Sequence, residues 1–202
     1  MASGSEPGEA AAKPEQRAAD SEGGASFGLP PDFIGRTPKQ RREVVWALAQ
    51  VRSRTRKSLP ETMRHSGEDG EPGVVPALTV ALQTDPDKLV KRHAAYGLAC
   101  VADDAIVPPL RGALALADPA TKGHAILGLG RRRAREAVPE LVGLLDDRYA
   151  SLMAADALVA IGDERGLGGL SAAAGRGLPL RRHRLRRRVW ALEAALGQQP
   201  PG

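Results

Sequence analysis

Aromatic residues are scarce in this chain, with two Trp, two Tyr and two Phe among 202 residues. A hydrophobic core with so few rings depends on Leu, Val and Ala, which are the plentiful apolar side chains here. Stacking on single-stranded nucleic acid also needs aromatic platforms. The scarcity of rings therefore weighs against that kind of binding.

Cysteine and long apolar runs are scarce as well. The single Cys100 forms no internal disulfide and fits a reducing compartment. No window reaches the ~20 apolar residues of a membrane span, and no basic segment followed by an apolar stretch opens the chain. We therefore expect a cytoplasmic protein with no membrane partner.

The motifs of common catalytic chemistry are missing too. Ser151 and Ser171 lack the Gly-x-Ser-x-Gly setting of a nucleophile, and His65 and His183 stand in a loop-forming segment and a charge run. Neither zinc-finger spacing nor a Gly-rich phosphate loop occurs. The sequence thus predicts no catalytic residue, no metal ligand and no cofactor.

What the chain does contain is a repeat with a period near 30 residues. Three similar phrases begin it, and a weaker fourth follows: Val75-Pro76-Ala77-Leu78, Val107-Pro108-Pro109-Leu110, Val138-Pro139-Glu140-Leu141 and Leu167-Gly168-Gly169-Leu170. Such periods are typical of stacked supersecondary units that share a continuous core.

Each unit has the apolar spacing of two helices. In the first unit, apolar residues recur at helical intervals from Val75 to Leu82, Asp85-Pro86 breaks the pattern, and a second helix begins near Lys88. Proline in Val-Pro-x-Leu marks a helix start, because the first turn has no intrahelical use for its N–H. Small residues at matching places in the second helices indicate close stacking: Gly97, Gly128 and Ala157.

This combination resembles the HEAT-like repeat of the phycobilisome-lyase type over residues 73 to 196. The shared features are Val-Pro-x-Leu, an Asp-containing break, a second helix with Ala-x-x-Ala/Gly-Leu, and a closing Gly-Asp as in Ile161-Gly162-Asp163. The resemblance implies an all-α fold, a right-handed α-α superhelix of about four helical hairpins. It implies no single activity, because lyases, hydroxylases and adaptors without known activity share this repeat.

The flanking segments differ in character from the repeats. Residues 1–37 are rich in Ala, Gly, Ser, Pro and Glu, which predicts a disordered tail, and residues 198–202 should be disordered too. Residues 38–72 should form a capping helix to about Arg54 and then a long surface loop, before the repeat domain at 73–197. The phrase Val45-Trp46-Ala47-Leu48 returns as Val189-Trp190-Ala191-Leu192, which fits helices that cover both ends of a solenoid.

The net charge of +5 is concentrated in two arginine-rich runs, at residues 131–135 and 181–188. Arginines in the first turns of the last helix meet the positive end of the helix dipole, which disfavours cations. A negatively charged partner would offset this repulsion. An acidic protein or peptide is the first candidate partner, and nucleic acid is the alternative. If the arginine-rich runs bind no partner, they form only a solvated basic surface.

Two further interpretations involve an enzyme. His93 and His124 occupy equivalent positions and would face each other across about one inter-helix spacing of ~10 Å. HEAT-like hydroxylases hold two irons with His-Glu pairs, whereas here Ala follows each His and Met153 takes the third place. Histidines packed between helices are the favoured explanation. The lyase resemblance implies tetrapyrrole chemistry, for which the sequence shows no distinct pocket.

The second helices of such a solenoid line its concave wall, so their positions not needed for the core should face a partner. The residues expected to face this wall include Ala95, Ile126, Arg148 and Ala155. The alternative is that Ile126 and Leu127 pack beneath the next repeat. The apolar residues on this wall would bury an apolar side chain of the partner, and the basic residues would favour a partner with acidic residues around that side chain. The residues predicted to bind the partner are Lys91, Arg92, Tyr96, Lys122, Leu127, Leu152, Asp156, Arg181, Arg182 and Arg184.

The sequence therefore predicts a non-catalytic adaptor or scaffold that binds an acidic protein or peptide on the concave face of a HEAT-like solenoid. A basic solenoid that binds nucleic acid is the alternative. A metal- or tetrapyrrole-dependent enzyme, or a lyase-like chaperone, is the second alternative.

Overall fold

The structure, a computed structural model, describes residues 29–58 and 73–197 of the chain. This part contains nine α-helices and no strand. The first helix stands alone, and the other eight form four hairpins. Their bounds are α1 Pro38–Ser58; α2 Val74–Thr84 and α3 Lys88–Ala99; α4 Val107–Ala113 and α5 Pro119–Arg131; α6 Val138–Gly143 and α7 Ser151–Ile161; α8 Arg165–Gly175 and α9 Pro179–Ala195.

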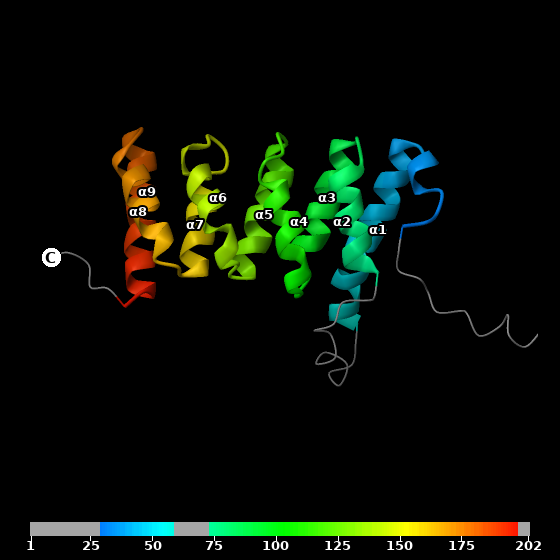
Figure 1. The fold of residues 1–202 in the computed structure, drawn as a ribbon, viewed down its shortest axis with the longest axis horizontal. Coiled ribbons are helices and arrows are strands. Elements are labelled where there is room, and N and C mark those ends of the chain that lie inside the picture. The colour runs from blue at the N-terminus through cyan, green and yellow to red at the C-terminus, as the bar shows by residue number, and fades with distance from the viewer. Residues whose placement is uncertain (1–28, 59–72, 198–202) are drawn as a thin grey trace, which may run out of the picture.

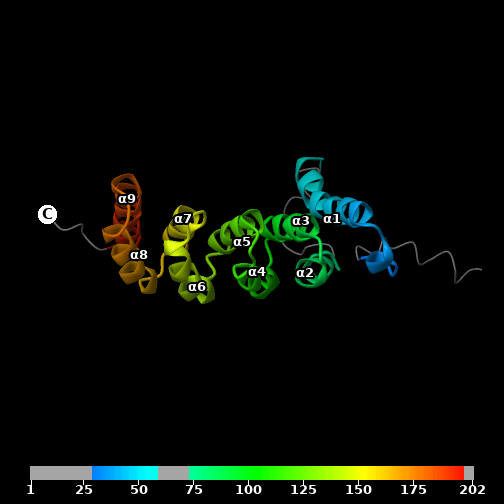
Figure 2. The ribbon, with the colours of Figure 1, turned by 90° about the horizontal axis from the view of Figure 1, so that it is seen from above.

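The helices stack in two rows along one long axis (Figure 1). Viewed from above, α1, α3, α5, α7 and α9 follow one another in one row, while α2, α4, α6 and α8 form the other (Figure 2). Both ends of the stack turn toward the row of α1 to α9, so this row lines the concave side, which we call the inner face. The predicted all-α solenoid of four helical hairpins is confirmed.

Aspartates at the hairpin turns explain where the second helices begin. Asp87 accepts hydrogen bonds from the N–H groups of Leu89 (2.8 Å) and Val90 at the start of α3. Asp118 likewise caps α5 through the N–H of Thr121 at 2.9 Å. These side chains satisfy N–H groups that have no partner within the helix, so each break in the apolar pattern is also a start signal.

Small residues allow the inner helices to approach closely. A methyl group placed on Gly97 would lie 3.0 Å from Cβ of Ala49, and one on Gly128 would lie 3.0 Å from Cα of Ala99. Both distances are shorter than nearly all real contacts of a Cβ atom. The backbones of α1, α3 and α5 therefore pack through positions that hold no side chain, as the repeated glycines indicated.

The ordered region begins earlier than composition suggested. The tail was expected to extend to residue 37, but residues Phe33–Gly35 form the 3₁₀ helix η2, and Phe33 is buried in the core. Burial of this large aromatic ring, together with Leu29, which packs against the core, orders a short segment that composition alone assigned to the tail. Helix α1 also continues to Ser58, past its expected end near Arg54. Residues 1–28, 59–72 and 198–202, with the expected tail, loop and C-terminal disorder, lie outside the described residues.

Candidate protein-binding face

Four rings from three helices meet on the inner face. The ring of Trp46 on α1 lies 4.9 Å from His93 and 5.9 Å from Tyr96, both on α3, and it stacks on Tyr96 at an interplanar angle of 25°. Tyr96 in turn meets His124 of α5 edge-on at 5.4 Å. The cluster thus brings together Trp46 and Tyr96, two of the few aromatic residues of the chain. Its contacts connect three successive inner helices, α1, α3 and α5.

The apolar surface continues from these rings toward α7. Trp46, Leu127 and Met153 are 43%, 44% and 42% exposed, respectively. Met153 packs over Gly123 of α5, where its Cε atom would lie 3.1 Å from an added methyl group. We call Trp46, Tyr96, Leu127 and Met153 the apolar strip. Exposed apolar residues gathered along one face are typical of a protein-binding surface.

Three residues expected on this face belong to the core instead. Ala95, Ile126 and Ala155 are completely or almost completely buried. Each inner helix packs against the helix before it, the helix after it and its own hairpin partner, so its buried arc is wider than the sequence pattern suggested. Leu152 is also half buried and packs against the core. Tyr96 and Leu127 do reach the surface.

Two of the basic residues expected to form a charged rim, Arg92 and Lys122, form ion pairs within the protein. Arg92 donates to both oxygens of Asp118, at 2.9 and 3.3 Å. Lys122 donates to Asp147 at 2.9 Å. Their charges are therefore largely neutralised by the next turn of the solenoid and are less available to a partner than the sequence indicated.

The other predicted charges have varied surroundings. Lys91 is half buried and makes no ion pair within the described part of the chain. Asp156 pairs with Arg188 at 2.8 and 3.0 Å. Arg182 is half buried, and its Nε atom lacks a hydrogen-bond partner among the described residues. Arg184 is exposed.

Arg181 and Arg184 line a cavity of about 270 Å³ at the hairpin turn before α9. Arg181 donates to the carbonyl oxygen of Leu145. Three large, strongly exposed apolar side chains also line this cavity: Tyr149, Leu178 and Leu180. The guanidinium carbon of Arg148 lies 5.5 Å from the centre of the Tyr149 ring. Basic groups and exposed apolar groups thus lie together at this place, as they do in interfaces.

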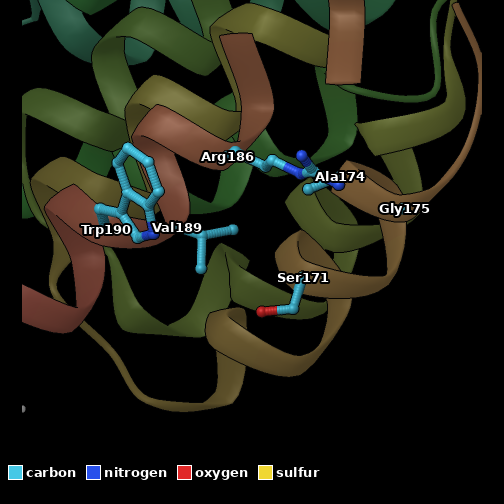
Figure 3. A pocket seen from close by; sticks show the side chains of 6 residues that line it. All are labelled: Ser171, Ala174, Gly175, Arg186, Val189 and Trp190. Carbon is cyan, nitrogen blue, oxygen red and sulfur yellow. The ribbon is translucent and has the colours of Figure 1, made fainter. Parts of the chain in front are cut away.

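A shallower hollow of about 220 Å³ lies between α8 and α9 (Figure 3). The side chains of Ser171 and Val189 point into it, and the ring of Trp190 stands at its edge. No His, Asp or Glu lines this hollow. The Ser171 hydroxyl therefore has no base beside it there.

His93 and His124 both lie within the ring cluster, where each imidazole packs against an aromatic ring. Burial is the main influence that lowers the pKa of both imidazoles, which favours their neutral form. Within residues 29–58 and 73–197, no group of three or more His, Cys, Asp or Glu side chains is placed to hold a metal ion. Neutral rings extend the apolar character of the strip.

Comparison with known families identifies the repeat. A family model described as HEAT repeats matches residues 75–162 and, in an overlapping register, residues 107–192. The chain belongs to the HEAT repeat family. A search of curated proteins found no match. In the described part of the chain, none of the HEAT helices has the length and apolarity needed to cross a membrane.

Solved structures with a similar fold include the complex of CpcE and CpcF of phycocyanin lyase from Nostoc sp. PCC7120. The match has a TM-score of 0.60 at 18% identity, and it covers 96% of this chain and 71% of the other. An identity this low shows the fold alone. It agrees with the resemblance of the HEAT units to the lyase-type repeat.

The aspartates at the turns join successive HEAT units along one edge of the solenoid. Asp87, Asp118 and Asp147 each cap or brace the helix that follows and also bind a basic residue of the preceding inner helix: Arg42, Arg92 and Lys122. The hydrogen bond from that basic residue is the main influence that lowers the pKa of each carboxyl to about 2. The ionised form is therefore favoured by folding.

We expect this edge to make the protein sensitive to acid. The ordinary pKa of 3.8 lies above the folded value of about 2, so the stabilisation is fully present above pH 4 and is lost as the pH falls toward 2. Urea denaturation at pH 7, 4, 3 and 2.5 measures this loss. The Asp118→Asn variant should have a lower free energy of unfolding at pH 7 and a shallower decline below pH 4. Equal stability at pH 7 and pH 3 would contradict the expectation.

Some members of the site were not identified from the sequence. The sequence pattern predicts Trp46 as part of a capping helix and Met153 only as the third member of the histidine series. It does not single out Tyr149, Leu178 or Leu180. A usable signal existed for Trp46, because a Trp on a helix that precedes a solenoid of small side chains has few buried places to occupy.

Proposed function

We propose that the protein is a non-catalytic scaffold whose inner face binds a segment of a partner protein. The observation that carries this proposal is the stacked pair Trp46 and Tyr96, which is partly exposed on the inner face. Tyr and Trp are the side chains that most often dominate binding energy at interfaces. Leu127 and Met153 extend the same surface over the next two inner helices.

The partner segment should combine apolar anchors with acidic residues. Cys100 and burial raise the pKa of the Tyr96 hydroxyl, and Arg131 stands near enough to this hydroxyl to oppose the rise. Lys91 also stands on α3 without an ion pair among the described residues. These two charges, together with the net charge of +5, favour an acidic rim around an apolar anchor.

The test is affinity purification with the tagged full chain at low and moderate salt, with nuclease treatment in parallel and mass spectrometry of the retained proteins. We expect a protein partner that survives nuclease and moderate salt, because an apolar contact depends less on salt than phosphate neutralisation does. The Trp46→Ala/Tyr96→Ala variant should weaken its binding by about 30-fold or more, the effect of losing an interface anchor.

Trp190→Ala is a matched control, because this exposed Trp lies in the hollow between α8 and α9 and outside the apolar strip. It should leave the affinity unchanged, and circular dichroism should show that both variants fold. Retention that disappears with nuclease would support nucleic-acid binding in place of the scaffold. Binding that the double variant leaves unchanged would exclude the apolar strip as the site.

A lyase-like role in handling a tetrapyrrole is a second candidate, supported by the likeness of fold to the phycocyanin lyase complex. In that case a linear tetrapyrrole added to the protein should bind saturably and change its visible absorption spectrum. The double variant should abolish that change if the ring cluster forms the binding surface. No spectral change would discard this candidate.

A further inference from the structure

Another concave site lies apart from the apolar strip, at the junction between the second and third hairpins. It is a cleft of about 410 Å³ between the start of α4 and the turn that follows α5. No aromatic residue and no member of the apolar strip lines it. Four arginines do: Arg111, Arg132, Arg133 and Arg135. We call this cleft the arginine cleft.

Two of these arginines are occupied by carboxylates. Arg111 donates from Nε and Nη2 to one oxygen of Glu140, at 2.9 and 2.5 Å. Arg132 donates to one oxygen of Asp104, with its Nε at 3.0 Å. The pairs fix the two guanidinium groups on the walls of the cleft and also neutralise their charge.

The other two arginines carry positive charge that the described residues do not bind. The exposed side chains of Arg133 and Arg135 make no hydrogen bond or ion pair within the described part of the chain. Glu136 also lines the cleft. The hydrogen bond from Arg165 is the main influence that lowers the pKa of Asp163 to about 2, and the charge of Arg135 makes a smaller contribution. The cleft therefore keeps a positive balance around Arg133.

The backbone at Arg133, just after α5, adopts a strained conformation, whereas a glycine holds the corresponding position after α7. Arg133 has a φ of 51° and is the one non-glycine residue with a positive φ among the described residues. The N–H of Ala134 donates to the carbonyl of Leu129 and the N–H of Arg133 to that of Gly130, which is the Schellman ending of a helix. Glycine normally holds this left-handed position, and Gly162 with φ 68° ends α7 in that way.

We propose that the arginine cleft binds a phosphate monoester group, with Arg133 and Arg135 as its ligands. A strained residue at a place that glycine would fill without cost indicates that its side chain has a use. A phosphate monoester carries nearly two negative charges and three acceptor oxygens, so it satisfies two guanidinium groups at once. A carboxylate carries about half that charge and has two acceptor oxygens, so it would leave more of the guanidinium donors without a partner.

The surroundings favour a single phosphate over a nucleic-acid strand. Asp104 and Glu136 stand in the lining, so the phosphates that precede and follow along a strand would meet carboxylates. The cleft also lacks the aromatic surface on which bases stack. The phosphate group has two sources of the same chemistry, a phosphorylated partner polypeptide and a small phosphorylated molecule.

Isothermal titration calorimetry on the full chain tests the proposal with four probes. They are a short neutral peptide carrying one phosphoserine, the same peptide without phosphate, O-phosphoserine, and a thymidine oligonucleotide. We expect saturable binding of the phosphopeptide and none of the unmodified peptide. Tighter binding of the phosphopeptide than of O-phosphoserine identifies a polypeptide as the source, and equal binding identifies a small molecule.

The Arg133→Gly variant separates binding from folding. Glycine accepts the left-handed conformation, so the variant should melt about 2–4 °C higher than the natural chain while its affinity for the phosphopeptide falls about ten-fold or more. Arg135→Gln removes the second ligand without touching the strained position and should also weaken binding. Arg187→Gln is the control for net charge, because Arg187 is exposed on α9 and lies outside the cleft.

Three results would overturn the proposal. The first is the absence of saturable binding by both phosphoserine probes. The second is an Arg133→Gly variant that folds and binds the phosphopeptide as tightly as the natural chain. The third is tighter binding of the thymidine oligonucleotide than of the phosphopeptide, which would assign the cleft to nucleic acid.

Discussion

Replacing Asp85 with Ala is expected to lower the free energy of unfolding by about 3–5 kcal/mol, the largest single effect among the ion pairs of residues 29–58 and 73–197. Asp85 is fully buried and accepts from Nε of Arg41 at 2.7 Å and from the N–H of Asp87 at 2.8 Å. Without its carboxylate, the guanidinium of Arg41 stays buried with only the carbonyl of Arg36 as partner. Urea denaturation monitored by circular dichroism measures the loss.

A double replacement provides the control for this prediction. The Asp85→Leu/Arg41→Met variant removes both charges and should recover much of the lost stability, because apolar side chains often replace a buried ion pair without cost. The Asp87→Ala variant should cost less than Asp85→Ala, since the Arg42 side chain that pairs with Asp87 is 36% exposed. A loss below about 1 kcal/mol for Asp85→Ala would show that Arg41 can move to water.

The Gly128→Val replacement should destabilise the protein by about 3 kcal/mol through overpacking between α3 and α5. The new Cβ would lie 3.0 Å from Cα of Ala99, which is backbone and cannot turn away as a flexible side chain would. The added methyl groups worsen this contact because they extend from the same atom. Thermal and urea denaturation would both show the change.

Gly168→Val in α8 is the matched control. A methyl group placed on Gly168 meets nothing within 4 Å, and this position is exposed. The same chemical change should therefore stay within about 0.5 kcal/mol of the natural chain. If Gly128→Val proved as mild as Gly168→Val, the inner helices would have room to move apart, and close stacking would not define this solenoid.

Local features of the sequence were sufficient to predict the helices and their pairing. Asp87 and Asp118 cap the helices that the breaks announced, and Pro108 and Pro139 lie in the first turns of α4 and α6. Caps and prolines act within one turn of the chain, so their effect is visible in a short window. Phe33 is the exception, because its order depends on burial in a distant core.

The exposed residues of the inner face were predicted less well than the helices, and particular residues show why. Tyr96 and Leu127 reach the surface, while Ala95 and Ile126 beside them do not. The helical period shows which residues share a face, but it does not show how wide an arc the neighbours will cover. That width depends on how closely α1, α5 and the hairpin partner α2 approach α3. The close approach of the inner helices is possible because glycines lie at the contacts.

The repeat period, the helical hairpins and the all-α stacked architecture follow from the residue order alone, because spacing, caps and prolines act over a few residues. The meeting of Trp46 with Tyr96, the pairing of Arg92 with Asp118 and of Lys122 with Asp147, and the arginine cleft required the assembled molecule. These contacts join residues from different units. Whether a side chain is buried, paired or free depends on the packing of neighbouring units against it, and no local window contains that information.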